Sequence, residues 1–262
     1  MLRDITLGQY FPRESVIHRM DPRMKIALMT AMISACLIAQ NAVEYAILSG
    51  FVLAVVLLAR VPISLYLKTL KPLAFFIVFT CIINLFSADG EILAQWWIFR
   101  ITREGITLAG LMMIRVILLV FISSLLTYTT SPIQLTNGLE SLMRPLKWVR
   151  FPSHDVAMMM TIALRFIPTL IEEADKIIKA QSARGIDFQS GGLIKRIKAL
   201  VPVLIPLFVS AFHRADELAV AMESRCYRGG EGRTSMIRLR VRAADWLAAT
   251  VCVALITGLV MI

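Results

Sequence analysis

Residues 157–185 read AMMMTIALRFIPTLIEEADKIIKAQSARG. The first eleven residues of this stretch are almost all apolar, whereas the part from Glu172 onward is amphipathic. Ser153 is a suitable N-cap, and a helix from there to Arg184 would be about 48 Å long at 1.5 Å per residue. Pro168 removes one backbone hydrogen bond and predicts a kink. The stretch therefore predicts one long helix with an apolar start and a charged end.

A second helix of this kind is predicted from about residue 192 to Arg225. Its apolar centre, residues 201–212, is too short to span a bilayer, and Pro202 and Pro206 predict a bend. Aligning the two helices with a shift of 41 residues favours a structural repeat, because four pairs are then identical: Ala174 and Ala215, Asp175 and Asp216, Ala180 and Ala221, Arg184 and Arg225.

Both helices end in an arginine, Arg184 before Gly185 and Arg225 before Cys226. One interpretation is an ordinary helix C-terminus, because arginine interacts well with the last carbonyls and glycine is preferred just beyond them. The other is a pair of docking tips for a partner with two acidic grooves. A guanidinium group makes bidentate bonds to carboxylates and is weakly hydrated. The repetition favours the docking tips.

Composition indicates a membrane protein, since 58% of the 262 residues are hydrophobic and only 18% are charged. The candidate membrane helices are residues 24–40, 42–59, 72–87, 106–127 and 243–262. The tryptophan-containing stretch 92–99 is too short to span and favours the membrane interface. A leucine stripe predicts a further interfacial helix at 132–148. We expect an all-α integral membrane protein with about five transmembrane helices, one interfacial helix and two long helices on the cytoplasmic side.

The distribution of basic residues predicts the orientation. Five Lys and Arg lie before or at the start of the first span, none lies in the next loop, and seventeen lie in residues 131–242. The positive-inside rule then places the N-terminus in the cytoplasm. We expect membrane helices in 1–130, a cytoplasmic-side region in 131–242 that contains helices 132–148, 153–184 and 192–225, and a last membrane helix in 243–262.

Other functional classes find little support in the sequence. It has no HExxH or GxSxG motif, so no catalytic residue is expected. Its histidines and cysteines lack metal-ligand spacing, so neither a metal nor another cofactor is expected. The basic residues do not form a face interleaved with aromatics, which argues against nucleic-acid binding. Residues 229–234 lack the ending of a phosphate loop and predict a connector. A channel or secondary transporter stays as the alternative, although Arg115 and Asn84 are the main polar residues found inside the spans.

Four stretches carry a resemblance to a known family: HRMDPRMK (18–25), TTSPIQLTNGLESLMRPLK (129–147), ALRFIPTLIEEADKIIKAQSARG (163–185) and ADELAVAMESRCYRGG (215–230). They are similar to the transmembrane T component of energy-coupling factor (ECF) transporters, the family that includes the EcfT and CbiQ proteins. The most specific motifs are two X-Arg-X triplets at the ends of coupling helices, which are Ala-Arg-Gly or close variants in the family. The second triplet here keeps only the arginine.

The resemblance implies a non-catalytic scaffold in the cell membrane of a bacterium or archaeon. It implies that the scaffold holds a substrate-binding S component and docks two cytosolic ABC-type ATPases, as a homodimer or heterodimer. ATP binding would move the two coupling helices and tilt the S component, so that a vitamin or metal ion is released inside. The implied docking residues are Ala183, Arg184, Gly185, Ser224, Arg225 and Cys226, supported by Asp175, Asp216, Pro168, Pro202 and Pro206.

Overall fold

The structure is a computed structural model that describes residues 10–87, 91–96, 99–149, 152–188, 192–229 and 239–261. The predicted connector 229–234 lies outside these residues except for its first glycine. The chain divides into two compact units, each described here by itself. The bundle unit lies within Gly8–Gly138 and Leu239–Ile262, and the hairpin unit lies within Leu139–Arg238.

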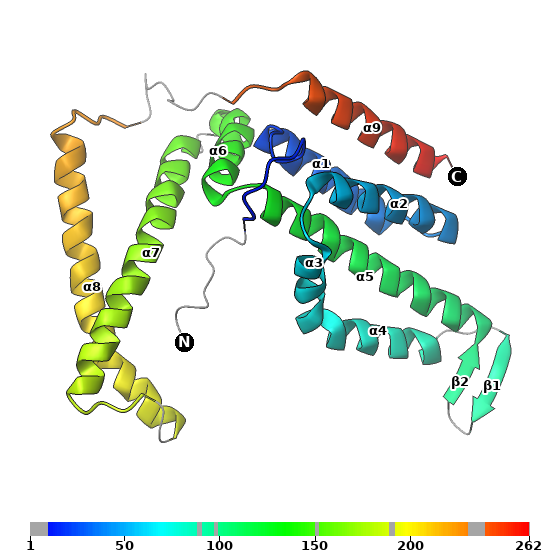
Figure 1. The fold of residues 1–262 in the computed structure, drawn as a ribbon, viewed down its shortest axis with the longest axis horizontal. Helices are drawn as coiled ribbons and strands as arrows, with labels where there is room; N and C mark the ends of the chain where they lie inside the picture. Colours follow the sequence, from blue (N-terminus) through cyan, green and yellow to red (C-terminus); the bar gives the residue numbers. More distant parts are fainter. Residues whose placement is uncertain are drawn as a thin grey trace. The chain divides into compact units, whose positions relative to one another are not determined.

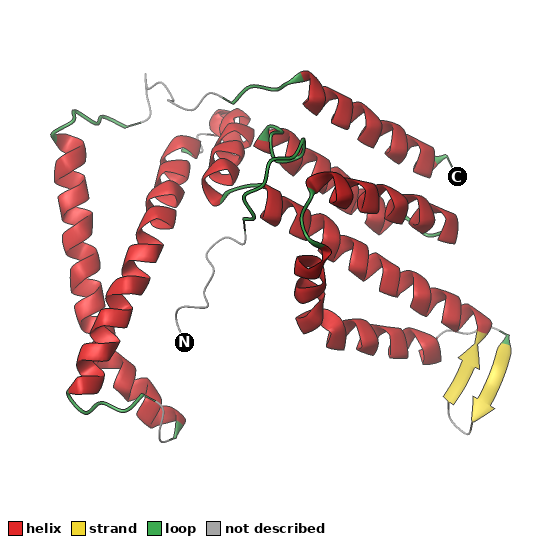
Figure 2. Cartoon of the chain, in the orientation of Figure 1, coloured by secondary structure: helices red, strands yellow, loops and turns green. Residues whose placement is uncertain are grey.

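The described chain is helical apart from one short β-hairpin (Figure 2), which confirms the predicted helical membrane class. The bundle unit contains α1 (Pro22–Ile38), α2 (Ala42–Ala59), α3 (Ile63–Leu70), the 3₁₀ turn η1 (Lys71–Leu73), α4 (Ala74–Ser87), α5 (Arg103–Thr129) and α9 (Ala243–Val260). The hairpin unit contains α7 (Ser153–Ala183) and α8 (Leu193–Glu223), and the boundary between the units falls inside α6 (Pro132–Met143).

By length and apolar composition, five helices among the described residues are able to cross a membrane, and three of them are or contain predicted spans (42–59, 72–87 and 106–127). The five are Ala42–Ala59, Ile63–Ser87, Arg103–Thr129, Ser153–Ala183 and Ile197–Glu223, with Ala243–Leu259 as a shorter apolar helix. The stretch Ile197–Glu223 is apolar enough on average to span, although its central apolar run is the predicted one, residues 201–212.

The start of α1 is a buried polar junction. The Asp21 carboxylate caps the helix by accepting a hydrogen bond from the Arg23 backbone N–H (3.0 Å). The Asp21 N–H in turn donates to the carboxylate of Asp245 in α9 (3.1 Å). The Lys25 ammonium donates to the carbonyl of Thr129 at the end of α5 (2.8 Å). Because all three charged side chains are buried, these bonds hold the ends of three helices together.

His18 lies beside this junction, and both nitrogens of its ring have a partner within hydrogen-bonding distance. Its Nε2 lies 3.0 Å from the carbonyl oxygen of Phe11 and its Nδ1 lies 2.7 Å from the Ser15 hydroxyl. A carbonyl only accepts, so Nε2 carries the proton and Nδ1 accepts from the serine. Burial lowers the pKa of His18, and the nearby Lys25 charge lowers it further.

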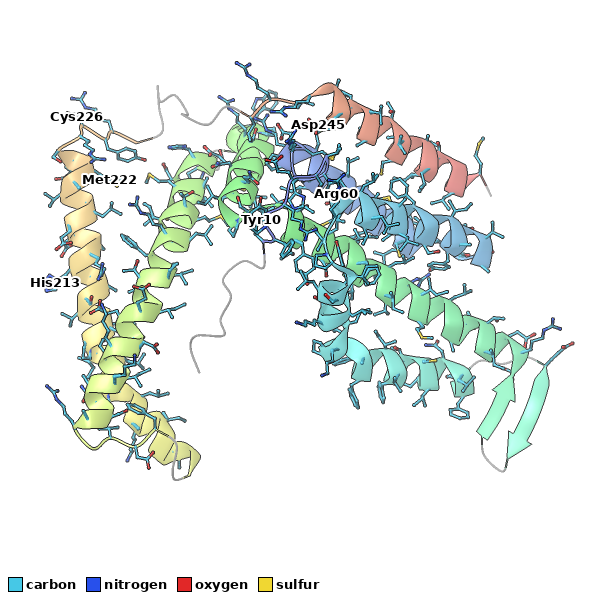
Figure 3. The ribbon with its side chains drawn as sticks, viewed as in Figure 1. Tyr10, Arg60, His213, Met222, Cys226 and Asp245 are labelled. Atoms are coloured by element: carbon cyan, nitrogen blue, oxygen red, sulfur yellow. The ribbon has the colours of Figure 1, made fainter. Side chains whose placement is uncertain are left out.

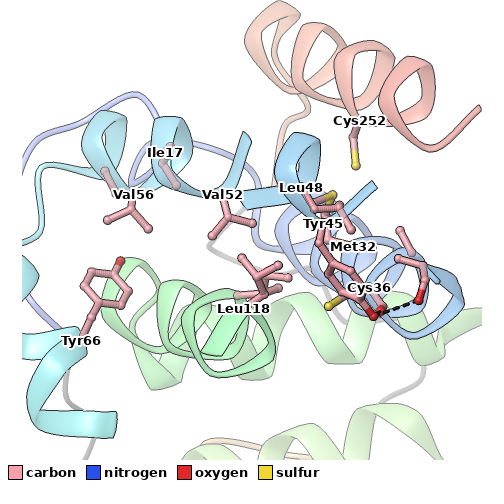
Figure 4. Close-up of a cluster of buried hydrophobic side chains, with 14 of the residues drawn as sticks. Ile17, Met32, Cys36, Tyr45, Leu48, Val52, Val56, Tyr66, Leu118 and Cys252 are labelled. Atoms are coloured by element: carbon pink, nitrogen blue, oxygen red, sulfur yellow. Dashed lines mark hydrogen bonds between the residues drawn. The ribbon is translucent and has the colours of Figure 1, made fainter. Parts of the chain in front are cut away.

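The core of the bundle unit is built around α5, which packs against α1, α2, α3 and α4. The largest side chains in the core are aromatic or aliphatic, such as Tyr45, Leu48, Tyr66 and Leu118 (Figure 4). On α4 the large apolar side chains instead stay exposed, with Phe75 at 73% and Phe76 at 63%. Exposed aromatic rings of this kind fit contact with lipid or another membrane helix better than contact with water.

Arg115, the charged residue predicted inside a span, links three helices. Its Nε donates to the hydroxyl of Tyr45 in α2 (2.5 Å), and its Nη2 donates to the carbonyl of Ala39 (2.7 Å), the C-cap of α1. The Tyr45 hydroxyl donates to the same carbonyl (2.8 Å). A cation at a helix C-terminus also interacts favourably with the helix dipole. The charge therefore has a structural partner within the bundle.

The stretch 92–99, for which a position at the membrane interface was predicted, forms part of an antiparallel hairpin of β1 (Ile92–Trp96) and β2 (Phe99–Thr102), which pairs its backbone groups locally; residues 97 and 98 lie outside the described chain. One local expectation was wrong. The helix predicted at 132–148 ends at Met143 and continues as a 3₁₀ segment, η2 (Arg144–Val149). Pro145 has no N–H for the α-helical ladder, which explains the change.

Candidate docking site

The helices α7 and α8 form an antiparallel, crossing pair (Figure 1). Near the end of α7, the Gln181 side chain donates to the carbonyl of Pro202 at 3.4 Å. Further back along α7, Glu173 forms an ion pair with Arg214 at 3.1 Å. As the residue number falls along α7 from one contact to the next, it rises along α8. The C-terminal ends of the two helices therefore point in opposite directions.

The predicted prolines lie inside the helices, Pro168 in α7 and Pro202 and Pro206 in α8. Pro206 has no N–H to donate to the carbonyl of residue 202, four positions earlier. That carbonyl is the one that accepts the hydrogen bond from Gln181. α8 also changes direction along its length, as Figure 1 shows. The proline thus bends α8 and frees a backbone acceptor for the neighbouring helix.

The end of α7 is a Schellman cap with Arg184 as the C-cap residue. Gly185 has φ +88°, in the left-handed region, and its N–H donates to the carbonyl of Ser182 (3.0 Å). The N–H of Ile186 donates to the carbonyl of Gln181 (3.1 Å). These are the two bonds that define the motif. They explain why a glycine follows the arginine.

The end of α8 has the same backbone design. Cys226 has φ +57°, and its N–H donates to the carbonyl of Glu223 (2.9 Å). The N–H of Tyr227 donates to the carbonyl of Met222 (3.0 Å); Met222 and Cys226 mark this end in Figure 3. Each donor and acceptor is 41 residues beyond its counterpart in α7. The repeat seen in four identical residues therefore extends to the backbone conformation.

The two arginines are free to meet a partner. Arg184 and Arg225 are exposed, and so are the residues that flank them in both triplets. Within the part of the chain that the structure describes, neither guanidinium group has a hydrogen bond or ion pair. We call these ends the α7 tip (Ala183, Arg184, Gly185) and the α8 tip (Ser224, Arg225, Cys226). Each tip presents five guanidinium N–H donors to solvent.

The supporting aspartates are not brought to the tips. Asp175 is half-buried and Asp216 is exposed, and each lies nine residues before its arginine. Their helical neighbours Glu173 and Arg214 instead make the contact between the helices, with side chains 29% and 36% exposed. These two residues are also 41 positions apart. A search for identical residues misses them, whereas a search for opposite charges at the repeat offset would have found them.

A second surface accompanies the tips. Along its apolar part α8 leaves a row of large side chains exposed: Ile197, Leu200, Val201, Leu204, Ile205, Phe208, Val209 and Phe212. Such a surface fits lipid or an apolar partner. Among the described residues, no three His, Cys, Asp or Glu side chains gather to hold a metal ion.

Comparison with known proteins gives the family of the chain. The sequence profile of a family described as "Cobalt transport protein", CbiQ, matches residues 13–236. The chain is 53% identical over 255 residues to the energy-coupling factor transporter transmembrane protein EcfT of Acidaminococcus fermentans, covering 97% of this chain and 95% of the relative.

Two further EcfT relatives match over nearly their full length. The protein of Ruminiclostridium cellulolyticum is 51% identical over 261 residues, covering 100% of this chain and 98% of the relative. The protein of Listeria innocua is 44% identical over 260 residues, covering 99% and 98%. The chain therefore belongs to the CbiQ/EcfT family, the transmembrane components of energy-coupling factor transporters.

Proposed function

We propose that the protein is the non-catalytic scaffold of an ECF importer, which transmits ATP-driven movement of two cytosolic ATPases to a membrane S component. The observation that carries the proposal is the pair of exposed arginines on matching Schellman caps at opposed helix ends. At an ordinary helix C-terminus the arginine bonds to the last carbonyls, but within the described residues neither guanidinium group makes such a bond. Two equivalent exposed tips suit a partner with two equivalent acidic grooves, such as an ATPase dimer.

The antiparallel geometry also favours a hairpin that lies along the membrane. Eleven residues separate Glu173 from Arg184, and eleven separate Arg214 from Arg225. Each tip therefore lies about 16 Å from the ion pair at 1.5 Å per residue, in opposite directions. The hydrocarbon core of a bilayer is about 30 Å thick. A hairpin that crossed it would place the tips on opposite sides, where one cytosolic ATPase pair could not reach both.

The exposed apolar row of α8 is the proposed contact for the S component. Apolar side chains beside a membrane can pack against another membrane protein while the charged helix ends stay in the cytoplasm. Rotation or separation of α7 and α8 at the tips would then move the S component, which is a shear motion of packed helices. The S component would select the substrate, a vitamin or a metal ion.

The proposed setting is the cell membrane of a bacterium or archaeon, with the N-terminus in the cytoplasm. The support is the seventeen Lys and Arg of residues 131–242 and the five that precede α1's apolar part. Residues 1–130 would hold membrane helices, residues 131–242 would couple to the ATPases, and residues 243–262 would return to the membrane.

The test is the double variant Arg184→Glu with Arg225→Glu, made in the complete transporter. We expect it to reach the membrane at the normal level but to lose co-purification with the ATPases and to lose uptake, because each charge reversal opposes an acidic groove. The matched control is Lys179→Glu with Arg228→Glu, which changes the same charge at exposed positions near the tips. Normal co-purification of the Arg184 and Arg225 variant would disprove the docking role.

The alternative, a self-sufficient channel or secondary transporter, has its own test. The chain reconstituted alone in vesicles should not transport substrate. Uptake without ATPases would favour the alternative, although Arg115 is already bonded to Tyr45 and Ala39 rather than lining a charged path.

A further inference from the structure

The Glu173–Arg214 ion pair lies midway between the two tips. Each tip arginine is eleven residues from the member of the pair on its own helix. The equal spacing follows from the 41-residue offset, which relates Glu173 to Arg214 as it relates Arg184 to Arg225. The two helices are antiparallel and equivalent, so a local twofold axis through the ion pair would exchange one helix with the other.

A residue on a twofold axis meets its own equivalent. Two identical charges at that position would repel each other, so a repeat that uses charge there must carry opposite signs. Glu173 and Arg214 meet this condition and form the ion pair, whereas the aspartates at the same offset, Asp175 and Asp216, carry like charges two residues further along each helix. Opposite charges at this pair of the repeat are therefore what direct contact requires.

The surroundings strengthen the pair. Both side chains are about two-thirds covered, so the ions are partly removed from water and interact more strongly than a pair on the surface. Removal of one partner would leave an uncompensated charge at the helix crossing. The second described contact between the helices, from Gln181 to Pro202, is a neutral bond of 3.4 Å. The ion pair is thus the stronger polar link between α7 and α8.

We propose that Glu173 and Arg214 are the pivot of the hairpin: they hold the crossing of α7 and α8 and thereby set the distance and the opposed directions of the two arginine tips. The effect on transport rests on the proposed function, because the distance between the tips matters for transport only if two ATPases dock on them. The geometric part concerns this chain alone. Both are positioning residues, and they do not touch the partner.

The geometric test measures the distance between the tips by pulsed electron spin resonance. Spin labels are placed on Ser182→Cys and on the native Cys226 of the full chain in nanodiscs, with Cys81 changed to serine; Cys36 and Cys252 are buried. We expect a narrow distribution at about 32 Å, because the labelled positions lie nine and twelve residues from Glu173 and Arg214 at 1.5 Å per residue. Glu173→Arg and Arg214→Glu should each broaden or shift it, and the charge-swapped double variant should restore it.

The functional test uses the same variants in the complete transporter. Each single variant should lower uptake about tenfold, as expected for an unpaired, partly buried charge, and the swap should return it to within about twofold. ATPase co-purification should persist in the single variants, since Arg184 and Arg225 are unchanged. The control Glu172→Arg makes the same charge reversal at the adjacent exposed position and should leave both readouts unchanged.

Two outcomes would overturn the pivot: single variants with the wild-type distance distribution, or a charge swap that fails to restore it. Neither depends on the ATPases. The distance distribution could change as expected in the Glu173 and Arg214 variants while the Arg184 and Arg225 variants still bind ATPases. That result would overturn the proposed function and leave the pivot in place.

Discussion

Cys226 holds a backbone conformation that residues with a side chain rarely adopt. Its φ of +57° places Cβ close to the following carbonyl, at a cost of about 1–2 kcal/mol. The equivalent residue at the other tip, Gly185, takes φ +88° without this cost. The Schellman bonds at both ends keep the conformation in place. The glycine of the Ala-Arg-Gly motif thus has a backbone role, distinct from that of the arginine.

Substitutions at these two positions should have opposite effects on the stability of the helix ends. Cys226→Gly should stabilise the end of α8, and Gly185→Ala should destabilise the end of α7, each by about 1 kcal/mol. Hydrogen exchange at the Tyr227 and Ile186 amides should report the change as roughly fivefold slower and faster exchange, respectively.

Gly50→Ala in α2 is the control for glycine replacement. Gly50 lies inside a helix with nothing within 4 Å of an added Cβ. The substitution should therefore stabilise α2 by about 0.5–1 kcal/mol. Faster exchange at Tyr227 after Cys226→Gly would contradict the strain argument.

At the scale of elements, polar groups inside the bundle join helices that apolar packing alone would leave free to slide. Tyr45 shows how: its hydroxyl accepts from Arg115 of α5 and donates to Ala39 at the end of α1. Tyr66 is equally buried, yet its hydroxyl has no hydrogen bond within the described chain. Two buried tyrosines in one core therefore have different energetic roles.

The same substitution should separate these roles. Tyr45→Phe leaves the Arg115 Nε without its acceptor and should lower the free energy of unfolding by about 1–3 kcal/mol. Tyr66→Phe removes a hydroxyl that has no described partner, so it should be neutral or stabilising. Thermal unfolding of the purified protein in one detergent measures both. Equal losses would show that the hydroxyl of Tyr45 contributes no more than that of Tyr66.

At the scale of the whole molecule, the question is how the hairpin unit lies in the membrane. Both α7 and α8 are long and apolar enough to cross it. Their antiparallel crossing places the two arginine tips at opposite ends, so only a hairpin along the surface presents both to the cytoplasm. The seventeen basic residues of 131–242 favour that position.

Accessibility to a membrane-impermeant maleimide tests the position of the hairpin. Ser182→Cys and the native Cys226, in a chain with Cys81→Ser, should both react in inside-out vesicles and neither should react in intact cells. The buried Cys36 and Cys252 provide the background in a chain that also lacks Cys226. Labelling of one tip from each side would show that the hairpin spans the membrane.

Local patterns in the sequence were enough to predict the helical membrane class, the helix ends at Arg184 and Arg225 and the repeat between them. These features depend on residues close together in the chain, where capping and apolar runs have direct physical signatures. The sequence misjudged the ending of α6, because Pro145 changes the backbone to a 3₁₀ segment there.

The contacts between distant segments came only from the tertiary structure. The antiparallel crossing, the Glu173–Arg214 pair, the Gln181 bond to Pro202 and the link from Arg115 to α1 each join groups at least 21 residues apart. No local pattern encodes which of many charged or polar side chains will meet after folding. Such pairs depend on the relative directions of helices, and packing rather than propensity determines those directions.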